Sequence, residues 1–305
     1  MDAQRGSPQT TGRSSEALHG LRGGDMFAGT PVAETSRSIW PMHAPNVPDA
    51  RTRFSNRVAD YVRYRPGYPP QVLHLLRQFG LVPESTVADV GSGTGLLTQL
   101  FLENGNTVYG VEPNQEMRLA GEESLAGFPN FRSVAAAAEA TTLSGNSVDL
   151  IAAGQAFHWF DPEPTRAEFR RILKPNGVVA LVWNVRRTTG TPFLRDYEAL
   201  LAEFGAEYTH VIHRTITDDG VRDLEGFFAP GCYRKQIIPD NFQHFDSEGL
   251  IGRARSASYM PTAGDPRLDE AIKALQELFN RHQHQGVVRV EYDTEVHVGW
   301  WGGEA

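Results

Sequence analysis

The stretch VADVGSGTG, residues 87–95, places three glycines where an apolar run ends and a helical pattern begins. Such a turn lets the backbone approach a ligand closely and directs the N–H groups of the helix N-terminus toward it. A dinucleotide-binding turn has the spacing G-x-G-x-x-G or G-x-G-x-x-A, which from Gly91 requires a small residue at position 96. Because Leu96 stands there and the third glycine is Gly95, the spacing argues against a pyrophosphate site and favours a smaller nucleoside ligand.

An acidic residue closes the next apolar run along the chain. Glu112 follows TVYGV, twenty-one residues after Gly91, and Asn114 behind it is a good N-cap for a helix. A carboxylate at this place can accept hydrogen bonds from both hydroxyls of a ribose. The alternative is a solvated strand end. The combination with the glycine turn favours the ribose-binding role.

Short apolar runs and helical patterns alternate from residue 86 to residue 184. This rhythm predicts a parallel sheet with right-handed crossovers. The runs VDLIAAG (148–154) and GVVALVWN (177–184) are apolar without alternation, as expected of strands covered on both faces. Before them, PQVLHLLRQFG (70–80) has helical spacing of its apolar residues between a proline and a glycine, and predicts a helix.

The region after Asn184 is mostly helical by pattern. Apolar stripes predict helices over 193–204 and 268–279. Residues 288–300 alternate between apolar or β-branched and polar side chains, which predicts a strand with one wet face, more typical of an antiparallel position. Residues 233–245 are its expected partner.

Composition narrows the function classes. The chain has 305 residues, enough for one large domain or two small ones, with 40% hydrophobic and 22% charged residues. Its 29 basic and 37 acidic residues give a net charge of -8, which disfavours nucleic acid as a partner. No apolar run approaches the roughly 20 residues of a membrane helix. The single Cys232 excludes an internal disulfide, and no CxxC pair exists to bind zinc, so no metal site is predicted.

The first fifty residues differ from the rest. Gly, Pro, Ser and Thr make up 20 of them, and no apolar period is sustained, so residues 1–50 are expected to form a disordered tail. Its arginines alternate with acidic residues and no apolar h-region is present, which argues against a transit or signal peptide. A cytoplasmic location is therefore expected.

With these motifs in this order, the sequence resembles the class I S-adenosylmethionine-dependent methyltransferases, and within them the small-molecule group that includes trans-aconitate methyltransferases. The resemblance covers about residues 52–300 and is densest from 87 to 184. It implies a Rossmann-like methyltransferase fold: an α/β architecture with a seven-stranded, mostly parallel sheet, an antiparallel last strand and helices on both faces. It also implies S-adenosylmethionine as the cofactor and a small-molecule methyl acceptor.

The resemblance assigns cofactor-binding residues motif by motif. VADVGSGTG matches the first motif of the family, and VEP the segment whose acidic residue binds the ribose. AAAEATTL resembles the loop beside the adenine, SVDLIAAGQAFHWFD the fourth strand and the lip of the active site, and YVRYRPGYP the segment that closes over the cofactor. The cofactor-binding residues implied in this way are Tyr64, Arg65, Asp89, Gly91, Ser92, Gly93, Gly95, Glu112, Pro113, Ala138, Glu139 and Gln155.

Arg65 is assigned because a guanidinium can hold the methionyl carboxylate through two hydrogen bonds. The alternative is that Tyr64 and Arg65 are a helix end and a surface cation. The chain is expected to divide into the tail (1–50), N-terminal helices that cap the cofactor site (51–84), the S-adenosylmethionine-binding core (85–190), and a helical substrate-side region with the last two strands (191–305), in the same domain as the core.

The implied reaction is an in-line displacement at a methyl group carried by a sulfonium. Holding the nucleophile and the methyl in line at about 3–3.5 Å supplies roughly 7–11 kcal/mol of the barrier, so a general base is needed only when the acceptor must lose a proton. His158, just past the fourth strand, is the candidate base, and a packing role is its alternative. The candidate acceptor-binding residues are Phe157, Trp159, Phe160 and Arg186. For Arg186, the alternative is a solvated pair of charges with Arg187.

Two other classes compete with a small-molecule methyltransferase. An NAD-dependent oxidoreductase would share the sheet and the acidic residue, but Leu96 breaks its fingerprint. A catalytically silent, regulatory S-adenosylmethionine-binding protein would keep the whole cofactor site. A nucleic-acid methyltransferase is disfavoured by the acidic balance and by the absence of an NPPY-like tetrapeptide, which that class uses to hold a flipped base. The acceptor, the atom methylated and the oligomeric state are left open.

Overall fold

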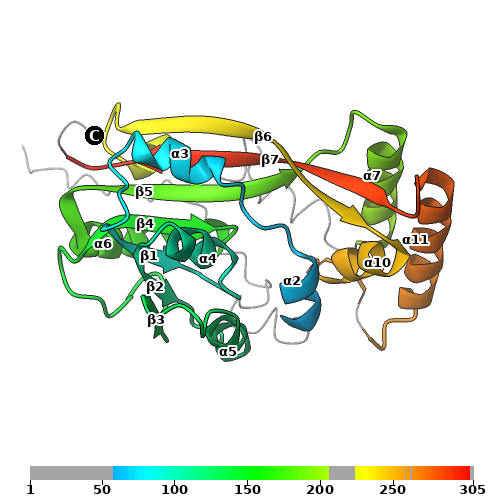
Figure 1. Ribbon diagram of the computed structural model, residues 1–305, viewed down its shortest axis with the longest axis horizontal. Helices are drawn as coiled ribbons and strands as arrows, with labels where there is room; N and C mark the ends of the chain where they lie inside the picture. The colour runs from blue at the N-terminus through cyan, green and yellow to red at the C-terminus, as the bar shows by residue number, and fades with distance from the viewer. Residues whose placement is uncertain (1–57, 206–223, 258, 262, 303–305) are drawn as a thin grey trace, which may run out of the picture. The chain divides into compact units, whose positions relative to one another are not determined.

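A seven-stranded sheet organises the chain, with the strand order β3-β2-β1-β4-β5-β7-β6 (Figure 1). The computed structural model describes residues 58–205, 224–257, 259–261 and 263–302. β1 to β5 run parallel, and β7 is antiparallel to both β5 and β6, as predicted. The strands are β1 Thr86–Val90, β2 Thr107–Val111, β3 Phe131–Val134, β4 Val148–Gly154, β5 Leu173–Arg186, β6 Tyr233–Phe245 and β7 Val288–Gly299.

Helices occupy the predicted connections. Asn114 caps α5, its side chain accepting a hydrogen bond from Met117 N at 2.9 Å. Gly80, the last residue of the stretch 70–80 that predicts a helix, has a φ of +90° and lies just after the end of the observed helix. The helices are α2 Val58–Tyr64, α3 Gln71–Arg77, α4 Leu96–Glu103, α5 Gln115–Ser124, η1 Phe157–Trp159, α6 Pro162–Ile172, α7 Pro192–Phe204, α9 Leu224–Phe227, α10 Ser247–Arg255 and α11 Leu268–His282.

One hydrophobic core lies between the sheet and the helices α3 and α4. Val72 and Leu76 of α3 and Phe101 of α4 are fully buried in it, against side chains from β1, β2, β4, β5 and β7. Alternate residues of β5 point to the opposite face, where Trp183 is buried. Both faces of the central strands are therefore covered, which explains their unbroken apolar sequences.

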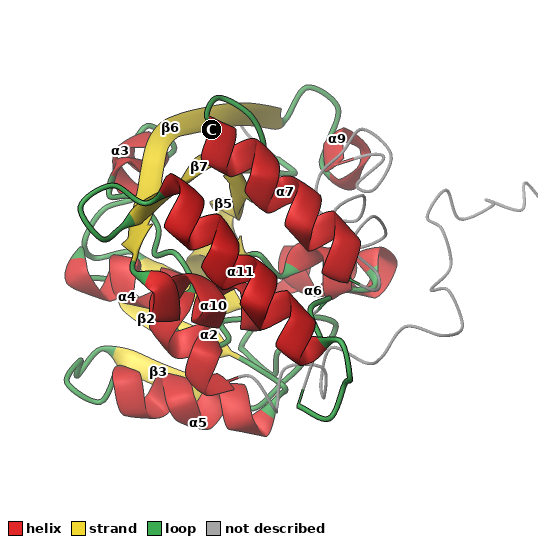
Figure 2. Cartoon of the chain, turned by 90° about the vertical axis from the view of Figure 1, so that its right-hand side faces the viewer, coloured by secondary structure: helices red, strands yellow, loops and turns green. Residues whose placement is uncertain are grey.

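A second core lies at the far ends of the long strands. β5, β6 and β7 have 12 to 14 residues, whereas β1 to β4 have 4 to 7. The ends of β6 and β7 pack against α7, α10 and α11, which lie together in Figure 2. This helical cap, α7, α10 and α11 with the strand ends beneath them, buries the predicted stripe of α7 and also Tyr64 from α2. From the predicted stripe of α11 it buries Leu275 and Phe279, whereas Leu268 and Ile272 are half-buried.

The face of β7 that was predicted to be solvent-exposed is exposed only in part. Arg289 is exposed, but His297 is 2% exposed. Its ring meets Trp183 edge to face at 5.3 Å, and its Nδ1 is 2.7 Å from the hydroxyl of Tyr233. The difference arises because neighbouring side chains from β5 and β6 cover this end of β7.

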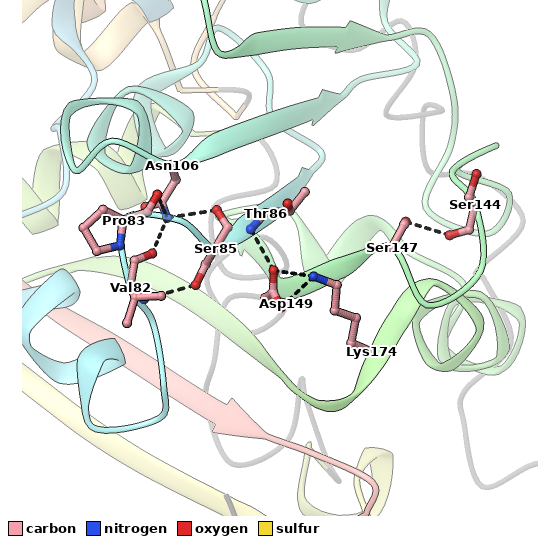
Figure 3. A network of polar contacts seen from close by, with 9 residues as sticks. All are labelled: Val82, Pro83, Ser85, Thr86, Asn106, Ser144, Ser147, Asp149 and Lys174. Atoms are coloured by element: carbon pink, nitrogen blue, oxygen red, sulfur yellow. Dashed lines mark hydrogen bonds and ion pairs between the residues drawn. The ribbon is translucent and has the colours of Figure 1, made fainter.

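Polar contacts fix the amino edge of the sheet (Figure 3). Asp149 at the start of β4 accepts a hydrogen bond from Thr86 N at 2.8 Å and pairs with Lys174 of β5 at 2.9 Å. Asn106 donates to the carbonyls of Val82 and Ser85. These residues hold the strand beginnings in register, at the edge opposite the glycine turn.

The predicted tail, 1–50, lies outside the described residues. Among the helices that the structure describes, none is long and apolar enough to cross a membrane.

Candidate functional site

The glycine turn leads from the end of β1 into α4. Gly91, Gly93 and Gly95 have φ angles of +70°, +56° and +89°, in the left-handed region that favours glycine. The N–H groups of Gly91 and Ser92 both donate to the carbonyl of Val111, at 2.8 and 3.1 Å. The end of β2 therefore fixes the turn at the carboxyl edge of the sheet, where ligands bind in open α/β folds.

Close packing also explains why two of these positions are glycine, which the sequence did not reveal. A Cβ at Gly91 would lie 2.6 Å from the Cβ of Ala156, and a Cβ at Gly95 would lie 2.6 Å from a methyl carbon of Leu125. At both places protein atoms occupy the space. That the glycines also make room for the methionyl part of a ligand stays a prediction.

Glu112 ends β2 beside the turn and is 7% exposed. One carboxylate oxygen accepts from Gly93 N at 2.9 Å, and the other accepts from Asn114 N at 2.8 Å. Burial raises the pKa of Glu112, while the two N–H groups and the charge of Arg118 oppose the rise. Glu112 is therefore not a solvated strand end. Each oxygen keeps a second lone pair for a ligand hydroxyl.

Asp89 lies below the turn and is 1% exposed. Its Oδ2 accepts from the hydroxyl of Thr98 at 2.6 Å, whereas its Oδ1 is buried with no hydrogen-bond partner among the described residues. Burial raises the pKa of Asp89 to about 7; the Thr98 hydrogen bond opposes this rise and the charge of Glu112 adds to it. An unsatisfied buried carboxyl oxygen is costly, and a ligand that donates a hydrogen bond would relieve that cost.

The segment after β4 begins with a strained residue. Gln155 has a φ of +56°, which is uncommon outside glycine. Its N–H donates to Val182 O at 2.9 Å and its side-chain amide to Asn184 O at 3.0 Å, so β5 holds it in place. Strained backbone of this kind clusters at functional sites, consistent with the predicted lip of the active site.

The aromatic residues of the lip divide into a buried and a half-buried set. Phe157 is buried and meets Phe160 and Phe227 edge to face, with centroid distances of 5.8 and 4.9 Å. Trp159 and Phe160 are half-buried, and so is His158, whose ring centroid lies 4.8 Å from that of Trp159. Phe157 thus packs within the protein, while the other three keep some exposed surface at the lip.

The loop predicted to lie beside an adenine joins this segment. Glu139 accepts a hydrogen bond from Asp161 N at 3.0 Å, and Ala138 is buried next to it in the chain. Ser92 is half-buried in the turn, and Pro113 is exposed after Glu112. The structure thus brings the loop after β3 to the segment after β4.

The end of α2 and the segment after it are held by the helical cap. Tyr64 is buried, and its ring covers Gly252 of α10 so closely that a side chain at Gly252 would collide with it. Arg65 donates from Nη2 to the carbonyl of Ser256 at 2.7 Å. Tyr64 and Arg65 are therefore fixed to α10, and their role toward a cofactor stays a prediction.

A buried amide ties this segment to the sheet. Asn184, near the end of β5, donates from its side chain to Gly67 O at 3.2 Å and accepts from the hydroxyl of Thr294 at 2.7 Å. Asn241 of β6 donates to both Gly67 O and Asn184 Oδ1. Asn184 of β5 and Asn241 of β6 therefore both hold the backbone at Gly67, and Thr294 of β7 supports Asn184.

A known family model matches the part of the chain that contains this carboxyl edge. Residues 88–181 match the family model described as a methyltransferase domain. We call residues 88–181 the methyltransferase domain, after the model that they match. The match begins within β1, contains the glycine turn, Glu112 and the lip, and ends within β5.

Relatives of the methyltransferase domain occur in distant organisms. An uncharacterized methyltransferase of Schizosaccharomyces pombe is 38% identical over 150 residues, which are 48% of this chain and 58% of that protein. One of Mycobacterium tuberculosis is 37% identical over 140 residues, 45% of this chain and 54% of that protein. The chain thus spans about half the length of the curated relatives it matches.

A solved structure shares the fold. A protein from Anaeromyxobacter dehalogenans, assigned as a type II methyltransferase, superposes with a TM-score of 0.57 and 21% identity. The match covers 79% of this chain and 100% of that one. At this identity the likeness establishes the Rossmann-like methyltransferase fold, as the sequence predicted.

The polar groups of the methyltransferase domain fit S-adenosylmethionine. Asp89 offers a buried oxygen without a partner among the described residues, and Glu112 offers acceptors for hydroxyls. Burial raises the pKa of both carboxyl groups, and a positively charged ligand beside them would favour their ionised forms. In the part of the chain that the structure describes, no group of three His, Cys, Asp or Glu residues is placed to hold a metal ion.

The arginines predicted after the fifth strand have partners within the protein. Arg186 pairs with Glu198 of α7 and lies over the ring of Tyr197, 5.1 Å from its centroid. Arg187 pairs with Asp293 at 2.6 Å. The Arg186 side chain is 10% exposed, so it is not the solvated charge of the alternative interpretation. Its binding of an acceptor stays a prediction.

Sequence reasoning missed Thr98, Asn184 and Arg253 of α10, whose Nε donates to the hydroxyl of Tyr292 at 3.1 Å. Each is a polar residue on a buried surface. Thr98 interrupts the apolar sequence of α4, and Asn184 ends the apolar run of β5. A polar residue inside an apolar run was the available signal, because such a residue is buried only with a partner.

Proposed function

We propose that this chain is an S-adenosylmethionine-dependent methyltransferase that methylates a small molecule by in-line displacement. The observation that carries the proposal is the joining of the glycine turn to Glu112, through the 2.9 Å hydrogen bond from Gly93 N, within a matched methyltransferase domain. The cofactor would supply a methyl group on a positively charged sulfur, which leaves as a neutral thioether.

The protein's own contribution is to bind, orient and exclude water. We infer that Glu112 accepts from the ribose hydroxyls, with its free lone pairs directed away from Gly93 and Asn114. Asp89 would accept from a donor on the methionyl part through Oδ1. A ligand donor or positive charge there would lower the raised pKa of Asp89, so binding and ionisation would support one another.

The acceptor would lie between the lip and the helical cap. Its small size is supported by the resemblance of residues 61–69 to the group that includes trans-aconitate methyltransferases, and by the net charge of -8. Trp159 and Phe160 would contribute apolar surface. Positioning carries most of such a transfer, so we assign His158 to the pocket wall rather than to proton abstraction.

The rival is an S-adenosylmethionine-binding protein without transfer activity. It would share every feature of the cofactor site and differ only at the acceptor.

The test uses the full chain with S-adenosylmethionine labelled in the methyl group. Calorimetry should show one cofactor per chain, and a screen of carboxylic acids, phenols and amines should give a labelled product. Absence of cofactor binding contradicts the proposal. Cofactor binding without methyl transfer to any acceptor class supports the alternative, an S-adenosylmethionine-binding protein without transfer activity.

A further inference from the structure

A β-bulge sets the direction of one polar side chain of β6. Ile238 pairs with Thr294 and Asn241 pairs with Tyr292, so β6 has one residue more than β7 between these pairs. Asp240, within the bulge, has a φ of +67°. Side chains alternate between the two faces of a strand, so without the extra residue Asn241 would lie on the face opposite to that of Ile238. The bulge therefore brings Asn241 to the face on which Ile238 packs against the core.

On that face, Asn184 joins two segments at the carboxyl edge of the sheet. Its side-chain amide donates to Gly67 O at 3.2 Å, and its main-chain carbonyl accepts from the side chain of Gln155 at 3.0 Å. Its side-chain oxygen accepts from the hydroxyl of Thr294 at 2.7 Å and from the amide of Asn241 at 3.0 Å. Asn184 thus connects the segment after α2 to the start of the lip, and β6 and β7 fix its orientation.

The backbone that these amides hold lies beside the glycine turn. A Cβ at Gly154, the last residue of β4, would lie 2.5 Å from the hydroxyl of Tyr68 and 3.1 Å from a methyl carbon of Leu97. Leu97 is the second residue of α4, which follows the glycine turn. Tyr68, the neighbour of Gly67 in the chain, therefore lies at the carboxyl edge on which the proposed cofactor site is built.

We propose that Asn184 and Asn241 are positioning residues, which hold residues 66–68 closed over the bound cofactor and slow its release. Gly67 O accepts from both side-chain amides, at 3.2 and 3.1 Å. These hydrogen bonds join neutral groups, and each contributes only modestly to stability, so the segment can open for the cofactor and close again. Glu112 and the glycine turn bind the ligand, and the two amides set how long it stays. This inference rests on the proposed binding of S-adenosylmethionine.

The first measurement needs no cofactor. Hydrogen exchange followed by mass spectrometry reports how often residues 65–68 open in the full chain. Asn241→Ala removes one of the two amide donors to Gly67 O and one of the two donors to Asn184 Oδ1. It should raise exchange in this segment about 3- to 10-fold, the effect expected of one or two neutral hydrogen bonds. Gln236→Ala is the matched control, since Gln236 is an exposed amide on the same strand, and should leave this exchange unchanged.

The second measurement is the release of labelled S-adenosylmethionine into an excess of unlabelled cofactor. Asn241→Ala should release the cofactor about 3- to 10-fold faster than the wild type, without slower association. Asn241→Asp has the same shape but turns a carboxylate oxygen toward Gly67 O and Asn184 Oδ1. It should release the cofactor faster still at neutral pH, and approach the rate of Asn241→Ala as the pH falls toward the ordinary Asp pKa of about 4, because protonation removes the charge. A merely structural residue would not give this pH profile.

The outcomes distinguish this inference from the proposed function. If Asn241→Ala exchanges and releases the cofactor like the wild type, the positioning role is wrong while the cofactor site stands. Faster exchange with an unchanged release rate shows that the segment does not enclose the cofactor, and it also overturns the inference. A fall in Tm without faster exchange in residues 65–68 makes Asn241 structural. If the wild-type chain does not bind S-adenosylmethionine, the proposed function fails and this inference fails with it.

Discussion

The methyltransferase domain and the helical cap form their sites in different ways. In the domain, backbone groups define the geometry: three glycines with positive φ, two N–H groups on Val111 O and two N–H groups on Glu112. In the cap, side chains from distant segments meet, as Arg253 of α10 and Tyr292 of β7 do. A site made of backbone can be recognised from a short motif, whereas a site made of distant side chains cannot.

The family match follows the same division. It ends at residue 181, inside β5, before any residue of the helical cap. We therefore propose that cofactor binding belongs to the methyltransferase domain and acceptor choice to the cap. The predictions below test that separation.

The largest effect is expected at Gly91. Gly91→Ala forces a Cβ to within 2.6 Å of Ala156 Cβ at a φ of +70°. Left-handed backbone costs about 1–2 kcal/mol and overpacking about 1–3 kcal/mol, so the free energy of unfolding should fall by roughly 2–5 kcal/mol, with loss of cofactor binding. Urea unfolding measures it. Gly127→Ala, with open space around the added methyl group and no positive φ, should change stability little. Equal stabilities of the two variants would show that the turn tolerates a side chain.

The next effect is a pH dependence of the free energy of unfolding, caused by Asp89. Because burial raises its folded pKa from 3.8 to about 7, its contribution to stability is fully present below pH 4 and is lost as the pH rises toward 7. Asp89→Asn does not titrate. The stability of this variant relative to the wild type should therefore increase between pH 4 and 7, by at most about 1.4 kcal/mol per pH unit, and level off above. Unfolding at several pH values checks this, and a constant difference would contradict the buried, unpaired carboxyl group.

A smaller effect, confined to the cofactor, is expected at Glu112. Glu112→Gln removes the negative charge and replaces one acceptor oxygen with a donor amide. The Kd of S-adenosylmethionine should rise roughly 10- to 100-fold by calorimetry, as expected for hydrogen bonds to a charged group. Glu123→Gln, on the exposed surface of α5, is the control. A change in acceptor preference without a change in cofactor affinity would break the separation of the two regions.

The smallest effect is expected at His158. If it packs the lip, His158→Ala should lower the methyl-transfer rate about tenfold or less, with poorer acceptor affinity and the pH profile of the wild type. A general base would instead give a loss of about 10²–10⁴ and remove an imidazole-like ionisation from the rate. Rates across pH 5–9 decide between the two roles.

Much of the fold was predictable from the sequence because its signals are local. The apolar run 148–154 is strand β4, and the run 177–184 lies within β5, which is longer at both ends. Asn114 caps α5 as expected. The antiparallel pair β6 and β7 followed from alternation in 288–300.

The site was less predictable because its contacts are not local. Arg186 and Arg187 gave no sign that α7 and β7 would supply their counter-ions. Arg253 looked like any basic residue of an amphipathic helix. Only the tertiary structure shows that it is buried beside Tyr292 and that no carboxylate among the described residues forms an ion pair with it. Side chains that pair across long sequence distances produce no motif that could be recognised in the sequence.

The most direct test of the central claim is a crystal structure of the chain with S-adenosylhomocysteine. We expect the ribose hydroxyls within hydrogen-bonding distance of Glu112 and the amino acid part at the glycine turn near Asp89. A nucleoside bound elsewhere, or bound here without a hydrogen bond to Glu112, would contradict it.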